Sequence, residues 1–256
     1  MKTLITGAAG YLGRGLVEPF AGRHELRLMD VVGFKTTHDL LVGDVADLET
    51  ARRATEGMDA MVIAHMASRQ AGAYQTPAGC FDANVKGTAN LFFAAAERGI
   101  RRVVLISSDG VRSGHPKGTF GTGDLPPKGN DLYTLTKACQ EVIAEQYARV
   151  EGMGVAVFRL GWVMNADTVI DKYGKKIPHY CVGMTDPRDI GQAARLACEL
   201  PDLGYEVLYV YGTPEADESC DAAHARRRLG WKPKYDFKWL PTAEEYERAK
   251  AEGKTP

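Results

Sequence analysis

The sequence has no long uninterrupted hydrophobic run. Its N-terminus passes from Met1-Lys2 into the apolar run Thr3-Leu4-Ile5, which is too short for the hydrophobic core of a signal peptide. No stretch approaches the roughly 20 apolar residues that cross a bilayer as a helix. We therefore expect no membrane partner and a cytoplasmic location.

Cysteine is scarce and forms no recognisable pattern. The five cysteines are Cys80, Cys139, Cys181, Cys198 and Cys220. Their number is odd, their spacing is wide, and no CxxC pair occurs. These features argue against a disulfide scaffold and against a cysteine-based zinc site, so we expect a reducing environment and no metal.

Neither sign of charge is in excess, because 32 Lys and Arg residues stand against 33 Asp and Glu residues. The formal net charge of −1 leaves no electrostatic footprint of the kind that binds nucleic acid. Hydrophobic residues make up 45% of the chain, which is ample for a buried core. The expected partner is a small molecule, with no nucleic acid involved.

Short apolar segments alternate with helical patterns along the chain. The predicted strands are residues 3–6, 25–29, 60–65, 102–107, 155–160 and 207–211. The predicted helices include residues 12–20, 48–55, 81–98, 132–150 and 189–199. This alternation is typical of βαβ units, so we expect an α/β protein with a doubly wound parallel sheet in one domain. Residues 165–256 add the remaining elements and a small C-terminal lid, and they end in a solvated tail from Arg248.

The first strand leads into the turn Thr6-Gly7-Ala8-Ala9-Gly10-Tyr11-Leu12-Gly13. A tight turn, a close approach of backbone to a pyrophosphate, and close helix-to-strand packing each require a residue without Cβ, and Gly7, Gly10 and Gly13 fit these roles. The N-terminus of the following helix offers N–H groups to phosphates. The spacing is GxxGxxG rather than the usual GxGxxG, and a plain tight turn is the alternative interpretation.

Asp30 ends the next predicted strand, about 20 residues after the glycines. A carboxylate there accepts hydrogen bonds from both ribose hydroxyls and repels a 2′-phosphate, which favours NAD over NADP. Arg27 and Lys35 lie near enough in the sequence to keep NADP open. Gly43-Asp44-Val45 follows a third short strand, where a simple turn is the alternative.

Tyr133 and Lys137 are four residues apart and share one face of the predicted helix. A free phenol titrates near 10, and a neighbouring ammonium lowers that pKa by roughly one to three units, so that Tyr133 can accept a hydroxyl proton. Ser107-Ser108 closes the preceding strand, at the edge where α/β sheets bind ligands. For Tyr133 and Lys137 the alternative is an amphipathic helix with a surface lysine. For Ser107-Ser108 it is an ordinary strand end or turn.

Taken together, these features resemble the extended short-chain dehydrogenase/reductase family, which is the NAD-dependent epimerase/dehydratase group. Besides the glycine turn, Gly43-Asp44-Val45, Ser107-Ser108, Tyr133 and Lys137, the resemblance rests on Ala64-His65-Met66-Ala67 and Asn84-Val85-Lys86-Gly87-Thr88. It implies a Rossmann-type fold, with residues 1–164 as the NAD-binding part. It also implies a homodimer formed through helices 81–98 and 132–150.

The resemblance also implies roles for individual residues. The implied cofactor contacts are Gly7, Gly10, Tyr11, Leu12, Gly13, Asp30, Asp44, Val45, Ala64, His65, Ala67, Asn84, Tyr133 and Lys137. The implied catalytic residues are Ser108, Tyr133 and Lys137, and the implied substrate contacts are Ser68, Ser108, Asp109 and Tyr133. His65 is expected to be structural rather than a metal ligand.

The reaction is narrowed by departures from other members of the family. The dehydratases resembled here carry an Asp-Glu pair after the hydroxyl residue, whereas this chain has Asp109 followed by Gly110, which argues against dehydration. The small C-terminal part and Leu229-Gly230-Trp231-Lys232-Pro233-Lys234 resemble uronate dehydrogenases. Those enzymes hold the substrate carboxylate with an arginine in the loop corresponding to 165–183, which here contains Lys172 and two further lysines but no arginine.

We therefore expect NAD-dependent oxidation of a hydroxyl of a free sugar or sugar acid, with Tyr133 as the base. A nucleotide-sugar epimerase and a dinucleotide-binding sensor without catalysis are the alternatives. Sensors in this family typically lack the Tyr-Lys pair, which is intact here.

Overall fold

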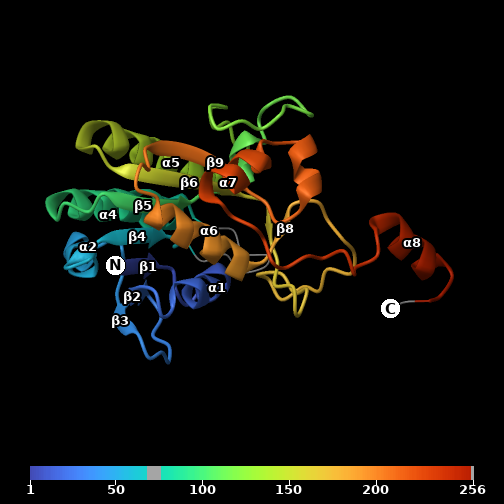
Figure 1. Ribbon diagram of the computed structural model, residues 1–256, viewed down its shortest axis with the longest axis horizontal. Coiled ribbons are helices and arrows are strands. Elements are labelled where there is room, and N and C mark those ends of the chain that lie inside the picture. Colours follow the sequence, from blue (N-terminus) through green and yellow to red (C-terminus); the bar gives the residue numbers. More distant parts are fainter. Residues whose placement is uncertain (68–75, 255–256) are drawn as a thin grey trace.

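The computed structural model describes residues 1–67 and 76–254. Its centre is a parallel sheet of seven strands in the order β3-β2-β1-β4-β5-β6-β9 (Figure 1). The strands are β1 (Lys2–Thr6), β2 (Glu25–Asp30), β3 (Asp39–Val42), β4 (Ala60–Ile63), β5 (Arg102–Ile106), β6 (Gly154–Leu160) and β9 (Tyr205–Val210). The predicted doubly wound sheet is confirmed. The strand order reverses between β1 and β4, where sheets of this kind bind ligands.

Two layers of helices cover the sheet. On one face lie α1 (Tyr11–Phe20), α6 (Pro187–Glu199) and α7 (Ala222–Leu229); on the other lie α2 (Leu48–Thr55), α4 (Gly87–Glu97) and α5 (Leu132–Glu151) (Figure 1). Neighbouring residues of β1 show the alternation of a strand, because Ile5 packs under the first layer and Leu4 under the second. Both residues are fully buried, as expected for strands covered on both faces.

The predicted helix 81–98 is wrong in its first part. A short helix α3 (Pro77–Cys80) leads into a π-helix η1 (Phe81–Lys86), and only then does α4 begin. The fully buried Asn84 lies in this wider turn. π-helical turns are rare and occur frequently at functional sites, and no local sequence pattern distinguishes them from an α-helix.

The smaller elements surround the carboxyl end of the sheet. They are the 3₁₀ helices η2 (Asp109–Arg112) and η3 (Pro214–Glu218), the two-stranded pair β7 (Trp162–Val163) and β8 (Met184–Thr185), and α8 (Ala243–Ala251). Met164, Val169, Ile177, Met184, Phe237 and Leu240 form a separate apolar cluster in this region. The segment from Arg248, predicted as a solvated tail, has no buried residue among those described, although α8 continues in it to Ala251. None of the helices described is long and apolar enough to cross a membrane.

Candidate active site

The glycine turn has the geometry of a site for a phosphate group. Gly7 has a φ of +71°, and a Cβ on it would lie 2.7 Å from the backbone nitrogen of His65. A Cβ on Gly13 would lie 2.0 Å from the carbonyl oxygen of Gly7. Helix α1 begins directly after Gly10, and no side chain caps its N-terminus. The first N–H groups of α1 therefore stay available for an anion.

Asp30 lies at the end of β2, next to this turn. Its Oδ2 accepts a hydrogen bond from the Ala9 N–H at 2.9 Å, and its Oδ1 accepts one from the Val32 N–H at 3.1 Å. The carboxylate is therefore fixed, with the second lone pair of each oxygen left for ribose hydroxyls.

Arg27 does not lie free beside Asp30 to receive a 2′-phosphate. Its Nε donates to Asp39 at 2.7 Å, and its Nη1 donates to the carbonyl oxygens of Arg53 and Glu56 at the end of α2. The residues present thus fit a dinucleotide that carries a ribose 2′-hydroxyl.

Asp44 and Val45 form the next turn along this edge. Asp44 Oδ1 accepts from the Ala46 N–H at 2.9 Å, and the buried Val45 packs so closely on Gly87 that a Cβ there would lie 2.4 Å from it. Asn90 donates to the Val45 carbonyl oxygen at 2.9 Å. These contacts connect the turn to α4, so its backbone is held in one position.

His65 is buried and bonded on both ring nitrogens. Nε2 faces the carbonyl oxygen of Ala83 at 3.1 Å and so carries the proton, while Nδ1 accepts from the Thr6 hydroxyl at 2.9 Å. Burial, assisted by the charge of Lys137, lowers the pKa of His65 to about 3, so the ring is neutral. No cluster of metal-ligating side chains occurs within residues 1–67 and 76–254. This geometry agrees with a structural role for His65.

Asn84 connects the loop after β4 to helix α5. Its Oδ1 accepts from the Ala67 N–H at 2.7 Å, and its Nδ2 donates to the Thr136 hydroxyl at 2.9 Å. The Thr136 hydroxyl in turn donates to the carbonyl oxygen of Tyr133 at 2.9 Å. Asn84 therefore positions the backbone that carries the candidate base. Ala64 lies on the same loop, and Ser68 lies outside the described residues.

Tyr133 lies in the first turn of α5, which starts with a capping box formed by Asp131 and Thr134. Lys137 lies one turn further and is only 2% exposed. Its Nζ donates to the carbonyl oxygen of Ile106, the last residue of β5, at 2.8 Å. Burial lowers the pKa of Lys137 to about 7, the nearby Lys172 adds to this, and Glu141 opposes it.

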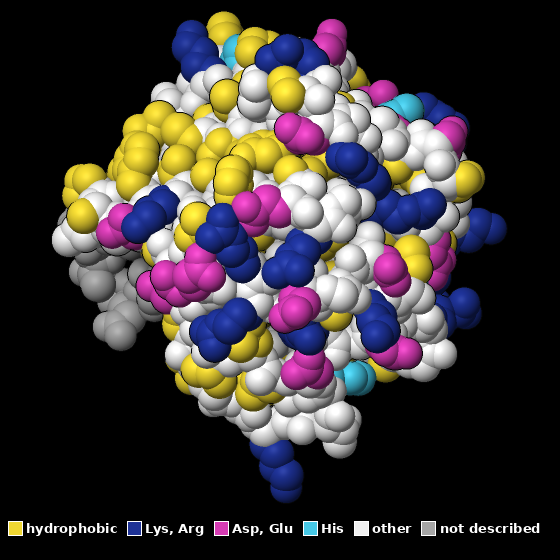
Figure 2. All heavy atoms as spheres, turned by 90° about the vertical axis from the view of Figure 1, so that its left-hand side faces the viewer, with side chains coloured by type: hydrophobic (Ala, Val, Ile, Leu, Met, Phe, Trp, Pro, Cys, Tyr) yellow, Lys and Arg dark blue, Asp and Glu magenta, His cyan; other side chains and the backbone are white. Residues whose placement is uncertain are grey.

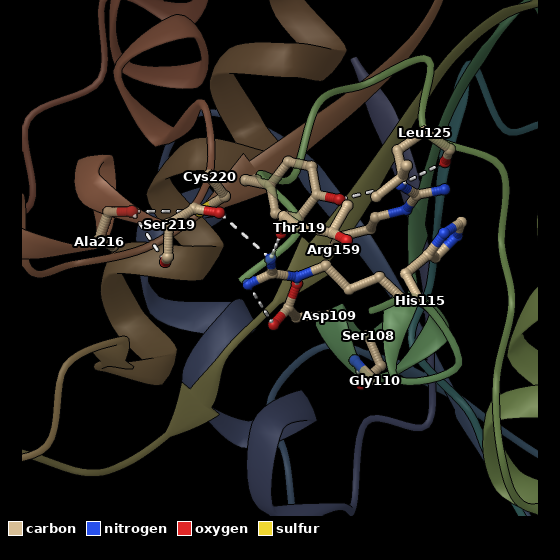
Figure 3. Close-up of polar contacts among 12 residues, drawn as sticks. Ser108, Asp109, Gly110, His115, Thr119, Leu125, Arg159, Ala216, Ser219 and Cys220 are labelled. Carbon is tan, nitrogen blue, oxygen red and sulfur yellow. Dashed lines mark hydrogen bonds and ion pairs between the residues drawn. The ribbon is translucent and has the colours of Figure 1, made fainter. Parts of the chain in front are cut away.

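The two serines after β5 point in different directions. Ser107 is buried, and its hydroxyl donates to Glu141 Oε1 at 2.5 Å. Ser108 caps η2, where its Oγ accepts from the Gly110 N–H at 3.1 Å (Figure 3). Because a Cβ on Gly110 would lie 3.0 Å from the Thr134 side chain, Ser108 stands close to the first turn of α5. Its hydroxyl proton remains available for a substrate oxygen.

Asp109, predicted to contact substrate, is held in an ion pair. Arg112 Nε donates to its Oδ1 at 2.5 Å, and the same guanidinium donates to the carbonyl oxygens of Thr119 and Ser219 (Figure 3). These bonds fasten the segment after η2 to the segment before α7. A substrate contact by Asp109 stays a prediction, and it has to share the carboxylate with Arg112.

Two features of the site were missed by sequence reasoning. The first is a buried ion pair beneath Lys137, in which Arg159 of β6 meets Glu141 of α5 with an Nη2-to-Oε2 distance of 2.8 Å (Figure 3 shows Arg159 and its bond to Leu125). The second is Lys172, whose ammonium lies 5.6 Å from the ring centroid of Tyr133. Neither could be found from spacing, because each pairs residues from distant segments.

Comparisons with known proteins agree with this geometry. The model of the NAD dependent epimerase/dehydratase family matches residues 3–190. An L-arabinose 1-dehydrogenase (NAD(P)(+)) of Haloferax volcanii is 28% identical, covering 91% of this chain and 96% of the relative. A uronate dehydrogenase of Pseudomonas syringae pv. tomato is 26% identical, covering 81% of this chain and 73% of the relative.

Among solved structures, uronate dehydrogenases are similar to this chain. The crystal structure of uronate dehydrogenase from Agrobacterium tumefaciens has a TM-score of 0.78 and 26% identity, covering 100% of this chain and 90% of that chain. A variant of that enzyme complexed with NAD matches to the same extent.

Proposed function

Because the family model covers residues 3–190, the chain belongs to the NAD-dependent epimerase/dehydratase family, and we propose that it oxidises a hydroxyl of a free sugar or sugar acid. It is an enzyme of the short-chain dehydrogenase/reductase type that uses NAD. The observation that carries the proposal is that α5 brings Tyr133 and Lys137 to the carboxyl end of β5, where Ser108 follows. The glycine turn lies at the same edge of the sheet.

Each residue of the candidate site has its own role in the proposed reaction. Gly7, Gly10 and Gly13 let the turn and the first N–H groups of α1 meet the pyrophosphate, and Asp30 accepts from the adenosine ribose. Bound NAD supplies the hydride acceptor. Tyr133 accepts the proton of the substrate hydroxyl, and Ser108 donates a hydrogen bond to the same oxygen. Lys137 favours the phenolate form of Tyr133 by its charge.

A free sugar suits the short elements that follow β6. The elements beyond β6 that close over the site are short, namely β7, β8 and the loop 165–183 between them. L-Arabinose 1-dehydrogenase and uronate dehydrogenase, the relatives that match most of this chain, are named for such substrates. We infer the same substrate class, a free sugar or sugar acid, for this chain.

A homodimer and a cytoplasmic location complete the proposal. Apolar side chains lie exposed along the outer faces of the helical segments around α4 and α5, and they are Phe81, Phe93, Leu135, Val142 and Val150. Figure 2, the side view, shows hydrophobic side chains gathered at its upper left, whereas charges of both signs are mixed over the rest of that face. An apolar face on paired helices is what an isologous four-helix interface buries.

The proposal is tested by mixing the purified protein with NAD and a panel of free sugars, sugar acids and nucleotide sugars. We expect NADH, followed by its near-ultraviolet absorbance, to form with a free sugar. Tyr133→Phe should lower kcat by about 10²–10⁴-fold, whereas Tyr173→Phe should leave it nearly unchanged. Conversion of a nucleotide sugar without net NADH would instead establish an epimerase. Tight NAD binding without turnover, and with the same NAD affinity in Tyr133→Phe, would indicate a sensor.

A further inference from the structure

A second ammonium group faces the candidate base. Lys172 Nζ lies 5.6 Å from the ring centroid of Tyr133 and 5.2 Å from that of Tyr173. Both distances lie within the range of a cation–π contact. Among residues 1–67 and 76–254, no acidic side chain forms an ion pair with Lys172. Its positive charge is therefore directed at the two rings rather than neutralised by a carboxylate.

Within residues 1–67 and 76–254, Lys172 and Lys137 are two ammonium groups near Tyr133 that no carboxylate pairs with. His65, from the loop after β4, is neutral because burial holds its pKa at about 3. Two ion pairs hold other charged groups of this region, and they are Asp109 with Arg112 on η2, and Glu141 on α5 with Arg159 on β6. The charge of Lys172 also acts on Lys137, which places both ammonium groups at one site.

The loop that carries Lys172 is tied to the glycine turn by the hydroxyl of Tyr11. Tyr11 donates to the carbonyl oxygen of Ile170 at 2.5 Å and accepts from the Asn165 N–H at 2.7 Å. Burial raises the pKa of Tyr11, so the hydroxyl keeps its proton and remains a donor. Ile170 precedes Lys172 by two residues. The side chain of Tyr11, a residue of the glycine turn, thus anchors the loop 165–183 next to Lys172.

Backbone strain marks the same loop. Val169 has a φ of +48°, a conformation that β-branched residues rarely adopt, and it is only 3% exposed. Its N–H donates to the Asn165 carbonyl oxygen at 2.8 Å, and its own carbonyl accepts from the Ile177 N–H at 2.9 Å. Strained backbone persists where surrounding contacts over-determine it. The loop is therefore built to keep one shape.

We propose that Lys172 stabilises the phenolate form of Tyr133, the form that accepts the substrate proton, and that Tyr11 is the positioning residue whose hydroxyl keeps Lys172 over the ring. The proposal rests on the proposed function, in which Tyr133 is the base. It gives Tyr11 a role in addition to the backbone contact with a pyrophosphate, because its side chain couples the cofactor turn to the loop over the substrate.

The first test is the pH profile of kcat/KM with a neutral aldose, which offers no carboxylate for Lys172 to bind. Because a cation lowers the pKa of a phenol, Lys172→Gln should move the acid limb of the profile to higher pH by about 0.5 unit. Below that limb, kcat/KM should fall about threefold. Lys172→Arg should restore the limb, and the matched control Lys175→Gln should leave it in place.

Two outcomes would overturn this role. A uniform loss at every pH would mean that Lys172 acts only through the structure of the loop. A raised KM for sugar acids, with an unmoved profile for the neutral aldose, would mean that Lys172 captures a carboxylate and does not act on Tyr133.

The second test is a double-mutant cycle between Tyr11→Phe and Lys172→Gln. Tyr11→Phe removes both hydroxyl bonds but keeps the ring and the backbone of the turn. We expect it to shift the pH limb in the same direction, with NAD affinity unchanged, and the double variant to show no further shift. Additive shifts, or no shift with Tyr11→Phe, would contradict the positioning role.

A third measurement does not depend on turnover. The near-ultraviolet pH titration of wild type minus that of Tyr133→Phe isolates the phenolate of Tyr133, and the same difference is recorded in the Lys172→Gln background. We expect the midpoint to lie about 0.5 unit higher without Lys172. If no sugar is oxidised, the proposed function fails while this titration still decides the role of Lys172. Equal midpoints would reject it.

Discussion

Lys137 combines two properties that oppose each other. The residue is 2% exposed, and burial lowers its pKa to about 7, yet the proposed reaction needs its charge beside Tyr133. Its ammonium donates a hydrogen bond to the carbonyl oxygen of Ile106, a neutral acceptor. In the unfolded chain the same group titrates near 10.4. The native protein without cofactor therefore binds fewer protons at Lys137 than the unfolded chain does over the range between these values.

This difference in proton binding predicts a pH-dependent effect of Lys137→Met. Stability rises with pH wherever the unfolded state binds more protons, so the buried amine destabilises the fold most below pH 7, and this penalty declines as the pH rises toward the unfolded value. Removing the amine while keeping the apolar stem should raise the free energy of unfolding by about 1–3 kcal/mol at acid pH. The gain should shrink at alkaline pH, as measured by urea unfolding at the two pH values.

The exposed Lys175→Met provides the matched control and should change stability little at either pH. A gain that is the same at both pH values would show that packing, rather than the buried charge, is responsible. Loss of turnover should accompany the gain in stability, because the proposed activity depends on the ammonium group.

Residues close in sequence were predictable at this scale, and residues brought together from a distance were not. The spacing of Tyr133 and Lys137 fixes their common helix face whatever the tertiary structure. Lys172 lies near Tyr133 on a loop in which Val169 has a positive φ and Ile170 accepts from the Tyr11 hydroxyl. The sequence therefore could not predict that Lys172 lies near Tyr133, because a lysine in a loop is ordinarily expected to be a surface charge.

At the scale of elements, α5 carries the proposed chemistry and is fastened at several points. Its N-terminus is capped by Asp131, and Asn84 reaches it through Thr136. Deeper in the protein, Glu141 accepts from Ser107 on β5 and pairs with Arg159 on β6. The side chains of Glu141 and Arg159 are 3% and 1% exposed, so the pair lies out of reach of water.

Breaking this buried pair should destabilise the fold strongly. Glu141→Leu leaves the Arg159 guanidinium buried without its carboxylate, and we expect the free energy of unfolding to fall by about 3–5 kcal/mol. The double variant Glu141→Leu with Arg159→Met removes both charges and should recover much of that loss. Urea unfolding of the three proteins measures the difference. A double variant less stable than Glu141→Leu alone would contradict this expectation and show that Arg159 stabilises the fold through its other bonds, such as that to the Leu125 carbonyl oxygen.

Strand and helix periodicity predicted the framework, and the exceptions have physical causes. The strands under two helical layers are continuous apolar runs, which makes them visible in the sequence. The π-helix η1 was predicted as ordinary helix because one wider turn leaves the apolar pattern almost unchanged. The pair β7 and β8 has two residues in each strand, too few for any alternation to be recognised.

At the scale of the whole molecule, the fold collects residues from most of the chain at one edge of the sheet. The turn after β1, the ends of β2 and β5, the start of α5 and the loop before β8 all meet there. This convergence follows from parallel strands, whose carboxyl ends share one edge. The sequence predicted the convergence through motif order, but not the contacts between the loops, such as that of Arg112 with Ser219.

The last prediction concerns dimer formation through the outer faces of α4 and α5. Val142 is 60% exposed near the middle of α5, so a carboxylate there disturbs nothing within the chain but has to be buried in a two-fold interface. We expect the wild type to sediment as a dimer and Val142→Asp as a monomer with unchanged circular dichroism. Val182→Asp, at a valine that is 51% exposed in the lid region, should remain a dimer. A wild-type protein that sediments as a monomer at micromolar concentration would reject the dimer. If both variants stay dimeric, the subunits associate through another surface, and the apolar face of α4 and α5 needs a different partner.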